Sequence, residues 1–428
     1  ENRGNGGLIE KTMFVPRIGL AYRWGDKTVI RAGFGLFRSF WWQVSSATEG
    51  TGAETTTTMV TSRDGVTPAD YLSNPFPQGL VQPTSTNSGL TTLVGSSISP
   101  FFYLKKFPYN NRWNLSIQHQ LARDMGIELA YVGNTGFRLP MGTGGQEQNR
   151  QIHYLPAQYL QLGSELNTPV ANPFHGVITT PGPLSQPTIP LSSLLSTYPH
   201  FTSVNMLRQT EGKSYYHSFQ TSFTKRYSAG IQIGATYTFS KSIEKMRYID
   251  PTNAGPSKMI GEYDRPHRAT LNLLWELPFA KGDRMLNKFI GGWQVNAVMI
   301  YQSGGPISLG NLLPTGVSPY LSRSEQSVDR WFNTDAFRVF PAFTVRTLPN
   351  YLTTLRNDGQ NNWDLSLLKT FPITPERVKL QFRFEMFNAL NRVQFGNPTI
   401  SPGSVTDGQI FSQANAPRML QLGLKLLF

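Results

Sequence analysis

The chain has 428 residues, of which 39% are hydrophobic, a formal net charge of +13 and no cysteine. The hydrophobic share can bury a large apolar surface, which argues against wholesale disorder. The absence of cysteine excludes a disulfide scaffold, thiol catalysis and thiolate metal sites. The 39 glycines and 30 prolines indicate many turns and few long helices. The chain contains no run of about 18 apolar residues, so the sequence predicts no membrane-spanning helix.

The positive charge first suggests a nucleic-acid partner, which would require a concentrated basic stripe or a known reading module. Lysine and arginine are instead dispersed along the chain, with short pairs only at Lys105-Lys106 and Lys225-Arg226. We therefore expect no binding to nucleic acid. The polar start, Glu1 to Gly7, cannot be the apolar core of an export signal, so we expect any such signal to lie upstream.

Apolar and polar residues alternate with a period of two along most of the chain. In the first such segment, Ile18 and Leu20 lie on one side and Arg17 and Arg23 on the other. This period predicts a β-strand with one apolar and one polar face. The pattern predicts about 11 strands of about 10 residues, at 14–24, 28–37, 113–121, 127–133, 215–226, 231–240, 268–277, 293–302, 363–371, 378–387 and 418–428.

The connections between these strands alternate between short and long. Tight turns are expected at 25–27, 124–126 and 228–230, whereas the longest connections are 39–111, 138–213 and 304–361. Short turns at one end and long loops at the other are typical of an antiparallel transmembrane β-barrel with a polar lumen. The strands of a soluble β-sandwich also alternate apolar and polar residues, but they average about 5–6 residues. Such a sandwich does not place its short loops at one end and its long loops at the other. The sequence therefore favours an all-β membrane barrel.

The strand count predicts an incomplete barrel. If the last strand ends on the periplasmic side at Phe428, strand 14–24 starts outside the cell. Single-chain bacterial barrels have an even number of strands, so about 11 strands indicate part of a larger barrel. An open edge in lipid leaves backbone groups without partners, at a cost of several kcal/mol each. We expect the segment to be unstable alone in a membrane.

Several stretches resemble the barrel of TonB-dependent receptors of the Oar-like branch. They span nearly the whole chain in order and include FVPRIGLAY (14–22), WNLSIQHQL (113–121), YHSFQTSFTKRYSAGIQIGATYTFSKSI (216–243), YDRPHRATLNLLWELPFAKG (263–282), GGWQVNAVMIYQSGGP (291–306), NWDLSLLKTFPI (362–373) and FRFEMFNALNRVQFGNP (382–398). The resemblance implies that residues 1–428 form the C-terminal half of a 22-stranded barrel. On this resemblance we expect the family's plug domain, N-terminal carboxypeptidase-regulatory-like domain and energy-coupling box to lie outside residues 1–428.

The resemblance also implies a location and partners. The location is the outer membrane of a Gram-negative cell, and the function is energised uptake of an unidentified ligand. The implied partners are outer-membrane lipid and lipopolysaccharide, the barrel-assembly machinery, and the TonB complex through the absent plug. No cofactor is implied. The alternative is a surface structural or adhesive barrel without transport, and a third reading is a secreted carbohydrate-binding β-protein.

The charged residues on the polar sides of the predicted strands are candidates for contact with a substrate or a plug. On strand 377–385 alternate residues share a face about 7 Å apart, which would give a ladder of Arg377, Lys379, Gln381, Arg383 and Glu385. A basic lumen could attract an anionic substrate; pairing with acidic groups of the plug or the missing strands is the interpretation we favour. The other candidates are Arg17, Arg23, Arg31, Glu128 and Lys425.

The C-terminus combines alternation with a final aromatic residue. Leu424, Leu426 and Phe428 lie on one face of the last strand, and this arrangement resembles the signal read by the barrel-assembly machinery. An ordinary lipid-facing strand would look the same, and both roles are compatible.

Catalytic motifs are missing, so we expect no enzyme. The six histidines show no HExxH spacing and no GxSxG elbow occurs. His267 lies near Asp264 and could form a proton relay, but a strand start held by side-chain hydrogen bonds is the favoured interpretation. Gly33 and Gly35 lie within a strand, where they allow bending or close approach. The aromatic residues of the long loops are expected to pack the loops together, although they could also stack on sugars; they are Trp41, Trp42, Tyr71, Phe101, Phe102, Tyr103, Trp331 and Phe332.

Overall fold

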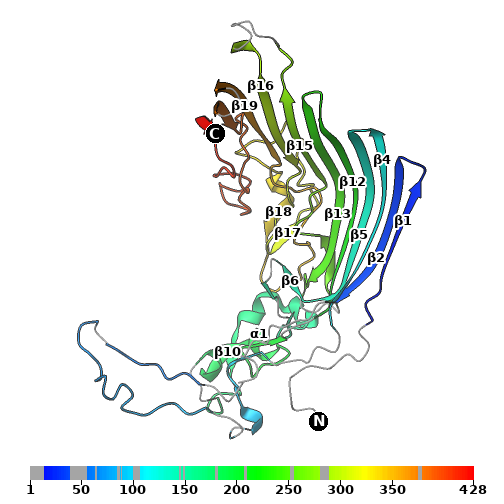
Figure 1. The fold of residues 1–428 in the computed structure, drawn as a ribbon. Helices are drawn as coiled ribbons and strands as arrows, with labels where there is room; N and C mark the ends of the chain where they lie inside the picture. The colour runs from blue at the N-terminus through cyan, green and yellow to red at the C-terminus, as the bar shows by residue number, and fades with distance from the viewer. Residues whose placement is uncertain are drawn as a thin grey trace.

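One curved antiparallel sheet dominates the computed structural model (Figure 1). The structure describes residues 14–38, 55–62, 65–83, 87, 89–99, 107–143, 146–147, 150–178, 182–206, 210–250, 255–279, 289–374 and 378–428. The strands of the sheet follow one another in chain order: β1 (Arg17–Trp24), β2 (Thr28–Arg38), β4 (Tyr109–Ala122), β5 (Met125–Leu139), β12 (Gly212–Ser228), β13 (Ile231–Arg247), β15 (His267–Glu276), β16 (Trp293–Gln302), β19 (Gln360–Thr374), β20 (Val378–Phe387) and β21 (Met419–Leu427). A twelfth strand, β14 (Ser257–Ile260), pairs with β13 beside this path.

The predicted strands are all present, and several are longer than expected. β16 and β20 have the predicted bounds, whereas β12 and β13 are 17 residues each and pair from Lys213 with Lys245 down to Ser228 with Ile231. The extra residues include Lys213, Lys245 and Arg247. Charged residues interrupt the apolar alternation at these strand ends, which is why periodicity alone missed them.

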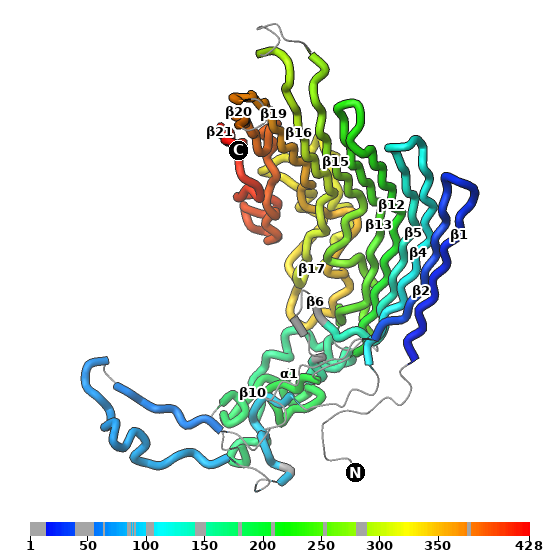
Figure 2. The backbone as a smooth tube through the Cα atoms, viewed as in Figure 1, coloured from blue at the N-terminus to red at the C-terminus, as the bar shows by residue number. Residues whose placement is uncertain are grey.

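The two ends of the sheet differ in their connections (Figure 2). At one end, called here the turn end, two residues join β4 to β5 and two join β12 to β13. Ala229 and Gly230 form the latter turn with φ of 49° and 77°, values that suit a tight hairpin. At the opposite end, called the loop end, the chain leaves the sheet for long excursions between β2 and β4, β5 and β12, and β16 and β19. The predicted alternation of short and long connections is therefore confirmed.

The two faces of the sheet differ in polarity. One row across the sheet joins Leu20, Leu115, Tyr131, Phe219 and Phe239 through consecutive register pairs. These side chains are 41–63% exposed. We call this side the apolar face and the opposite side the polar face. Large apolar residues that stay exposed along a whole sheet fit contact with lipid rather than with water.

The sheet does not close on itself. β1 pairs with β2 and β21 pairs with β20, but β1 and β21 are not paired with each other. Each edge therefore presents a row of backbone groups without a ladder partner among the described strands. The sheet is therefore open, while the expectation that it is part of a larger barrel stays a prediction.

Short elements fill the excursions at the loop end, where α1 and β10 lie beyond the sheet (Figure 1). Between β2 and β4 are η2 (Gly89–Thr91) and β3 (Ser97–Ile98). Between β5 and β12 are β6 (Gly142–Thr143), β7 (Gln146–Glu147), β8 (Arg150–Gln151), η3 (Ala157–Asn167), β9 (Pro169–Ala171), η4 (Pro183–Ser185), β10 (Thr188–Pro190), α1 (Leu191–Leu194) and β11 (Ser203–Met206). β11 pairs with β3 and β8, so these two excursions are joined to each other. Among the described residues, no helix is both long and apolar enough to cross a membrane.

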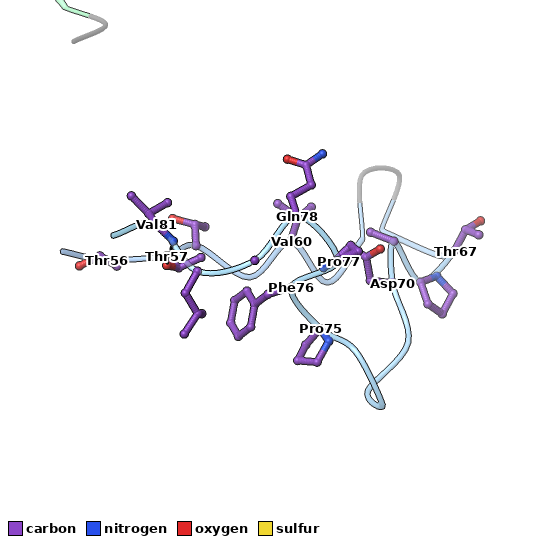
Figure 3. Close-up of a pocket in the computed structure, with 15 residues that line it drawn as sticks. Thr56, Thr57, Val60, Thr67, Asp70, Pro75, Phe76, Pro77, Gln78 and Val81 are labelled. Carbon is purple, nitrogen blue, oxygen red and sulfur yellow. Dashed lines mark hydrogen bonds between the residues drawn. The ribbon is translucent and has the colours of Figure 1, made fainter. Parts of the chain in front are cut away.

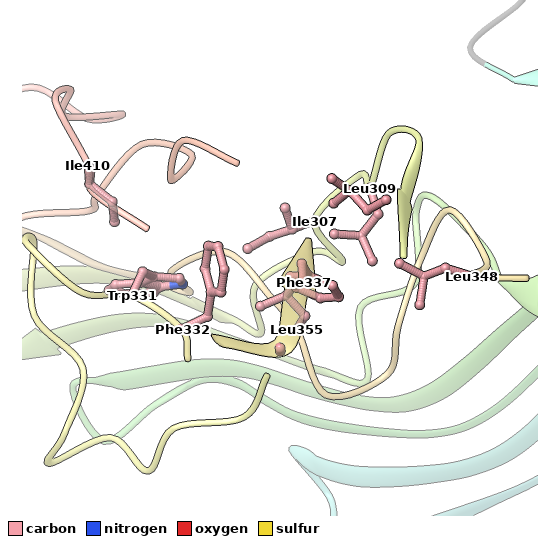
Figure 4. Packing of buried hydrophobic residues seen from close by; sticks show 10 residues of the cluster. Ile307, Leu309, Trp331, Phe332, Phe337, Leu348, Leu355 and Ile410 are labelled. Carbon is pink, nitrogen blue, oxygen red and sulfur yellow. The ribbon is translucent and has the colours of Figure 1, made fainter. Parts of the chain in front are cut away.

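A separate hydrophobic core lies in the excursion between β16 and β19 (Figure 4). This excursion contains β17 (Leu312–Pro314), η5 (Thr334–Ala336) and β18 (Phe337–Val339). Its apolar side chains pack with Ile410 from the segment between β20 and β21, and the members are Ile307, Leu309, Leu312, Trp331, Phe332, Ala336, Phe337, Leu348, Leu355 and Ile410. We call residues 304–359 and 388–418 around this core the loop cluster. The expectation that loop aromatics pack the loops together is confirmed for Trp331 and Phe332 and wrong for Tyr71, which is 84% exposed. The other five aromatics of that prediction, Trp41, Trp42, Phe101, Phe102 and Tyr103, lie outside the described residues.

Candidate functional site

The polar face is lined mainly by neutral side chains that hydrogen-bond to one another. Ser218 and Ser240 are 2% and 7% exposed, and the Ser240 hydroxyl donates to the Arg265 carbonyl at 2.9 Å. The Thr236 and Thr270 hydroxyls lie 2.7 Å apart on β13 and β15. Because the alternation leaves small hydroxyl and amide groups here, this face suits contact with water or a polar ligand rather than a packed core.

The predicted charged residues lie on this polar face along β1, β2 and β5. Arg31 Nη1 donates to Gln118 Oε1 of β4 at 2.7 Å, and Gln118 is in register with Glu128 of β5. Arg23 pairs with Asp26 of the adjacent turn at 3.2 Å. Arg31 and Arg23 thus have local polar partners, whereas the Arg17 guanidinium carbon lies 4.7 Å from the centroid of the Phe37 ring.

The charge ladder on β20 is partly neutralised within its own strand. Arg383 Nη2 lies 3.3 Å from Glu385 Oε1, and Gln381 is in register with Lys425 of β21. Lys379 is in register with Leu427 at the turn end. Arg377 lies outside the described residues. The alternation places Arg383 and Glu385 on one face of the strand but does not indicate that they form an ion pair with each other.

A buried carboxylate fastens the loop cluster to the sheet. Asp264 is 1% exposed. Its Oδ2 accepts a hydrogen bond from Arg356 Nη2 at 2.5 Å, and its Oδ1 accepts one from the Ser242 backbone amide at 2.7 Å. Arg356 Nη1 also donates to the Gly304 carbonyl at 3.2 Å. Burial, with a smaller contribution from the nearby Arg356 charge, lowers the pKa of Arg265. A buried ion pair stabilises a fold only when its remaining polar atoms are also hydrogen-bonded. Here the backbone amide of Ser242 and the backbone carbonyl of Gly304 supply those hydrogen bonds.

Asp264 and His267 bind different partners in the structure. The His267 Nδ1 lies 2.8 Å from the Tyr237 hydroxyl on the apolar face, whereas Asp264 pairs with Arg356. Side-chain hydrogen bonds therefore hold the start of β15, as favoured above. Sequence reasoning missed Arg356 because it lies 92 positions from Asp264 and no local motif marks it.

A second buried carboxylate joins the two parts of the loop cluster. Asp358 is 6% exposed; its Oδ2 accepts the Phe395 amide at 3.1 Å, and its Oδ1 accepts the Gly359 amide at 3.0 Å and Arg323 Nη2 at 3.1 Å. The excursions before β19 and after β20 therefore form one structural unit.

A pocket of about 390 Å³ opens where this unit meets the start of β15. It brings together a carboxylate, a guanidinium, aromatic rings and two amides, contributed by Glu262, Arg265, Tyr263, Tyr351, Asn357 and Asn397. This mixture can hydrogen-bond a polar ligand and stack against it. We call it the loop-end pocket.

A larger pocket of about 980 Å³ lies elsewhere (Figure 3). All its lining residues, such as Thr57, Asp70 and Phe76, fall within 56–81, a single excursion away from the sheet. Because no strand of the sheet contributes to it, we do not assign it to the polar face. In the described part of the chain, no group of three or more His, Asp or Glu residues is arranged to hold a metal ion.

The C-terminal strand carries its predicted pattern on the apolar face. Leu424 and Leu426 are 71% and 52% exposed, and Phe428 is 99% exposed beyond the end of β21. These residues form the outermost apolar row at one open edge.

The open sheet, its apolar outside and its polar inside define an outer-membrane β-barrel protein. Residues 3–421 match the family model described as outer membrane beta barrel domain, and the chain belongs to this family. It is therefore a protein of the outer membrane. No curated protein matches the chain.

Solved structures similar to this chain include outer-membrane transporters and receptors. The outer membrane transporter YddB from Escherichia coli has 10% identity and a TM-score of 0.41, over 94% of this chain and 39% of that one. The unliganded ferric citrate transporter FecA has 12% identity and a TM-score of 0.41, over 96% and 38%. BauA, the ferric preacinetobactin receptor from Acinetobacter baumannii, has 10% identity and a TM-score of 0.40, over 96% and 36%. The chain thus spans less than two fifths of the length of each.

Proposed function

We propose that this chain forms the C-terminal half of the barrel of an energised outer-membrane receptor, of the TonB-dependent, Oar-like type. The observation that carries the proposal is the open eleven-strand path, whose two edges have no partner strand among the residues that the structure describes. A sheet with an apolar outer face cannot remain open in lipid, so further strands must cover β1 and β21. The ordered resemblance of segments such as 216–243 and 382–398 supports the particular receptor type.

In this proposal the turn end faces the periplasm and the loop end faces the medium. Residues 1–428 form one barrel segment with external loops at 39–111, 138–213 and 304–361. The polar face lines the lumen, in which a plug contributed by another part of the receptor would sit. The TonB complex would pull on that plug and open a path for the ligand. The barrel-assembly machinery would bind the terminal residues Leu424, Leu426 and Phe428.

The charged lumen residues are proposed to contact the plug more than the substrate. Arg31 and Glu128 lie near the β1 edge, and Lys379 and Lys425 lie near the β21 edge. Arg383 is already paired with Glu385, which weakens the field available to attract an anion. The loop-end pocket, with its aromatic and amide groups, is the proposed first contact for the ligand.

The test is energised uptake in the native host. Solutes removed from the medium would be compared between wild-type cells and cells lacking the gene, with and without a protonophore. Uptake by a receptor of this type requires a proton-motive force, so the wild-type advantage should vanish with the protonophore and when TonB is absent. A difference in surface attachment that ignores the protonophore would replace this proposal with an adhesive barrel.

The pocket can be tested in the same cells. Tyr263 is 70% exposed and lines the loop-end pocket, so Tyr263→Ala should lower the uptake rate. Tyr320 is 59% exposed in the same loop cluster but does not line the pocket, so Tyr320→Ala is the matched control. Equal rates for the two variants would remove the pocket from the ligand path.

A further inference from the structure

A basic patch lies on the outer side of the sheet, at the loop end. Four consecutive strands contribute to one row, in which Tyr109 pairs with Phe137, Phe137 with Lys213, and Lys213 with Lys245. We call Tyr109, Phe137, Arg138, Lys213 and Lys245 the basic rim. A pocket of about 500 Å³ is lined by all five of these residues.

The basic rim belongs to the apolar face and not to the polar one. Lys213 lies two residues from Tyr215, which is on the same side of β12 as Phe219. The ring of Phe137 packs edge-on against Tyr215, with centroids 6.3 Å apart, and stacks on Tyr109 at 5.2 Å. The patch therefore continues the exposed apolar band toward the loop end.

Arg138 joins the basic rim through an unusual backbone conformation. In a regular strand its side chain would point opposite to that of Phe137. Its φ is 53°, in the left-handed region that a non-glycine residue rarely adopts. Its guanidinium carbon lies 5.3 Å from the centroid of the Tyr109 ring. This backbone conformation places the Arg138 guanidinium on the same face as Lys213 and Lys245, beside the stacked rings of Tyr109 and Phe137.

The two lysines are placed where like charges oppose each other. Lys213 and Lys245 are direct cross-strand neighbours, an arrangement that is destabilising without a counter-charge. Within the described residues neither ammonium group has a hydrogen-bond or ion-pair partner. Glu211 also lines the pocket, but its carboxylate accepts a hydrogen bond from the Tyr248 hydroxyl. An anion held between the lysines would relieve this repulsion.

Aromatic groups just below the basic rim mark the level of a membrane interface. Trp113 and His217 lie on the same face with ring centroids 5.9 Å apart, and the Tyr131 hydroxyl lies 2.7 Å from His217 Nδ1. Rings with a polar atom concentrate where acyl chains meet headgroups. Headgroups would therefore lie one step farther out, against the basic rim.

We propose that the basic rim binds a phosphate group of lipopolysaccharide in the outer leaflet. Lys213, Lys245 and Arg138 would hold the phosphate, while the acyl chains would lie on the apolar face below. Cationic residues at a membrane surface bind anionic headgroups by charge attraction, and guanidinium matches phosphate geometry. This inference rests on the proposed function only for the orientation, in which the loop end faces the medium.

The experiment measures lipopolysaccharide bound to the complete receptor purified from outer membranes. The Lys213→Gln, Lys245→Gln double variant should bind phosphorylated lipopolysaccharide about tenfold or more weakly than the wild type. The Lys379→Gln, Lys425→Gln double variant removes the same charge from the polar face and should bind as the wild type does. The Lys213→Arg, Lys245→Arg variant should restore binding, which also shows that the site tolerates substitution.

Chemically altered lipids identify the group that is recognised. Dephosphorylated lipopolysaccharide should bind the wild type as weakly as the phosphorylated lipid binds the glutamine variant. Inorganic phosphate should not displace the lipid; displacement would assign the patch to a free anion instead. An equal loss in the polar-face control, or no loss in the glutamine variant, would overturn the proposal.

The lipopolysaccharide-binding test does not depend on whether the receptor transports a ligand. Loss of protonophore-sensitive uptake with normal lipid binding would reject the proposed function and leave the lipid site intact. Normal uptake with lipid binding unchanged in the glutamine variant would reject the lipid site alone.

Discussion

The sheet and the loop cluster place their apolar residues in opposite ways. On the sheet, Leu424 and Trp24 are 71% and 66% exposed while Ser218 is 2% exposed. In the loop cluster, Leu309 and Phe332 are 0% and 1% exposed. The sheet is patterned for an apolar solvent outside and a polar space inside, whereas the loop cluster folds like a small water-soluble domain. The two regions should therefore respond differently to the same kind of substitution.

The largest expected effect is loss of the loop-cluster core. Phe332→Ala removes a buried ring that packs edge-on against Phe337, and such truncations cost about 3–5 kcal/mol. We expect residues 304–359 to become sensitive to added protease in intact cells, while the heat-modifiable mobility of the barrel is retained.

The control is Val317→Ala, because Val317 is 48% exposed in the same excursion. Its proteolysis should match that of the wild type. If Phe332→Ala destabilised the sheet as much as the loop cluster, the two regions would have to be regarded as one cooperative unit.

The second expected effect is release of the loop cluster from the sheet. Asp264→Ala leaves Arg356 without its carboxylate, and breaking a buried pair from one side costs about 3 kcal/mol or more. Amide hydrogen exchange should accelerate around residue 356 and around Gly304, whose carbonyl also binds Arg356.

Asp335→Ala offers the comparison, because Asp335 is exposed in the same loop cluster. Its exchange pattern should be unchanged. Equal protection of residues 304 and 356 in the Asp264 variant and the wild type would show that the apolar core alone holds the loop cluster in place.

The third expected effect concerns the sheet and depends on which face is changed. Leu271 and Asn272 are neighbours in the middle of β15 and point to opposite faces. Leu271→Arg puts a charge on the apolar face and should cost about 2–4 kcal/mol at mid-membrane depth. Asn272→Arg, on the polar face, should cost much less.

The measurement is the amount of heat-modifiable protein in isolated outer membranes, followed by its urea midpoint. Similar losses for the two arginine variants would contradict the assignment of the apolar face to lipid.

The smallest expected effect is a pH dependence at the turn end. Lys225 Nζ donates to Asp124 Oδ2 at 2.5 Å, and the Ser228 hydroxyl donates to the same atom. These hydrogen bonds, that from Lys225 first, lower the pKa of Asp124 from 3.8 to about 2. A lowered carboxyl pKa stabilises the fold above the unfolded value and ceases to do so as the pH falls through the folded value.

The advantage of the wild type over Asp124→Asn in urea midpoint should thus be constant above about pH 4 and shrink toward about pH 2. Asp26→Asn provides the control, because Asp26 lies in the corresponding turn between β1 and β2. A difference between wild type and Asp124→Asn that stayed constant down to about pH 2 would mean that the carboxylate charge is not responsible.

Sequence periodicity predicted strand bounds well where the surroundings of each side chain, lipid or the polar interior, alone decide whether it is apolar or polar. The alternation in β16 and β20 predicted their bounds to the residue, because each side chain there meets either lipid or the polar interior. It underestimated β12 and β13, whose loop-end residues Lys213 and Lys245 do not follow the apolar alternation. The charged candidates Arg383 and Glu385 were found by the same rule, but their mutual ion pair was not.

Contacts between distant segments were beyond reach of the sequence. Trp331 was expected to pack, but its neighbour Phe395 lies in the excursion after β20. The partner of Asp264 is Arg356, and no spacing rule connects them. The third cation of the basic rim depends on the left-handed φ of Arg138, which side-chain alternation would place on the opposite face.

The sequence by itself determined the β class, the strand order and the two faces, because a period of two and the lengths of connections act locally along the chain. Only the tertiary structure decided which loops share a core, which carboxylates are buried and which cations meet on the basic rim. These features depend on register and on packing between segments as far apart as residues 264 and 356. The register of paired strands fixes which side chains lie next to each other, even when those residues are far apart in the sequence.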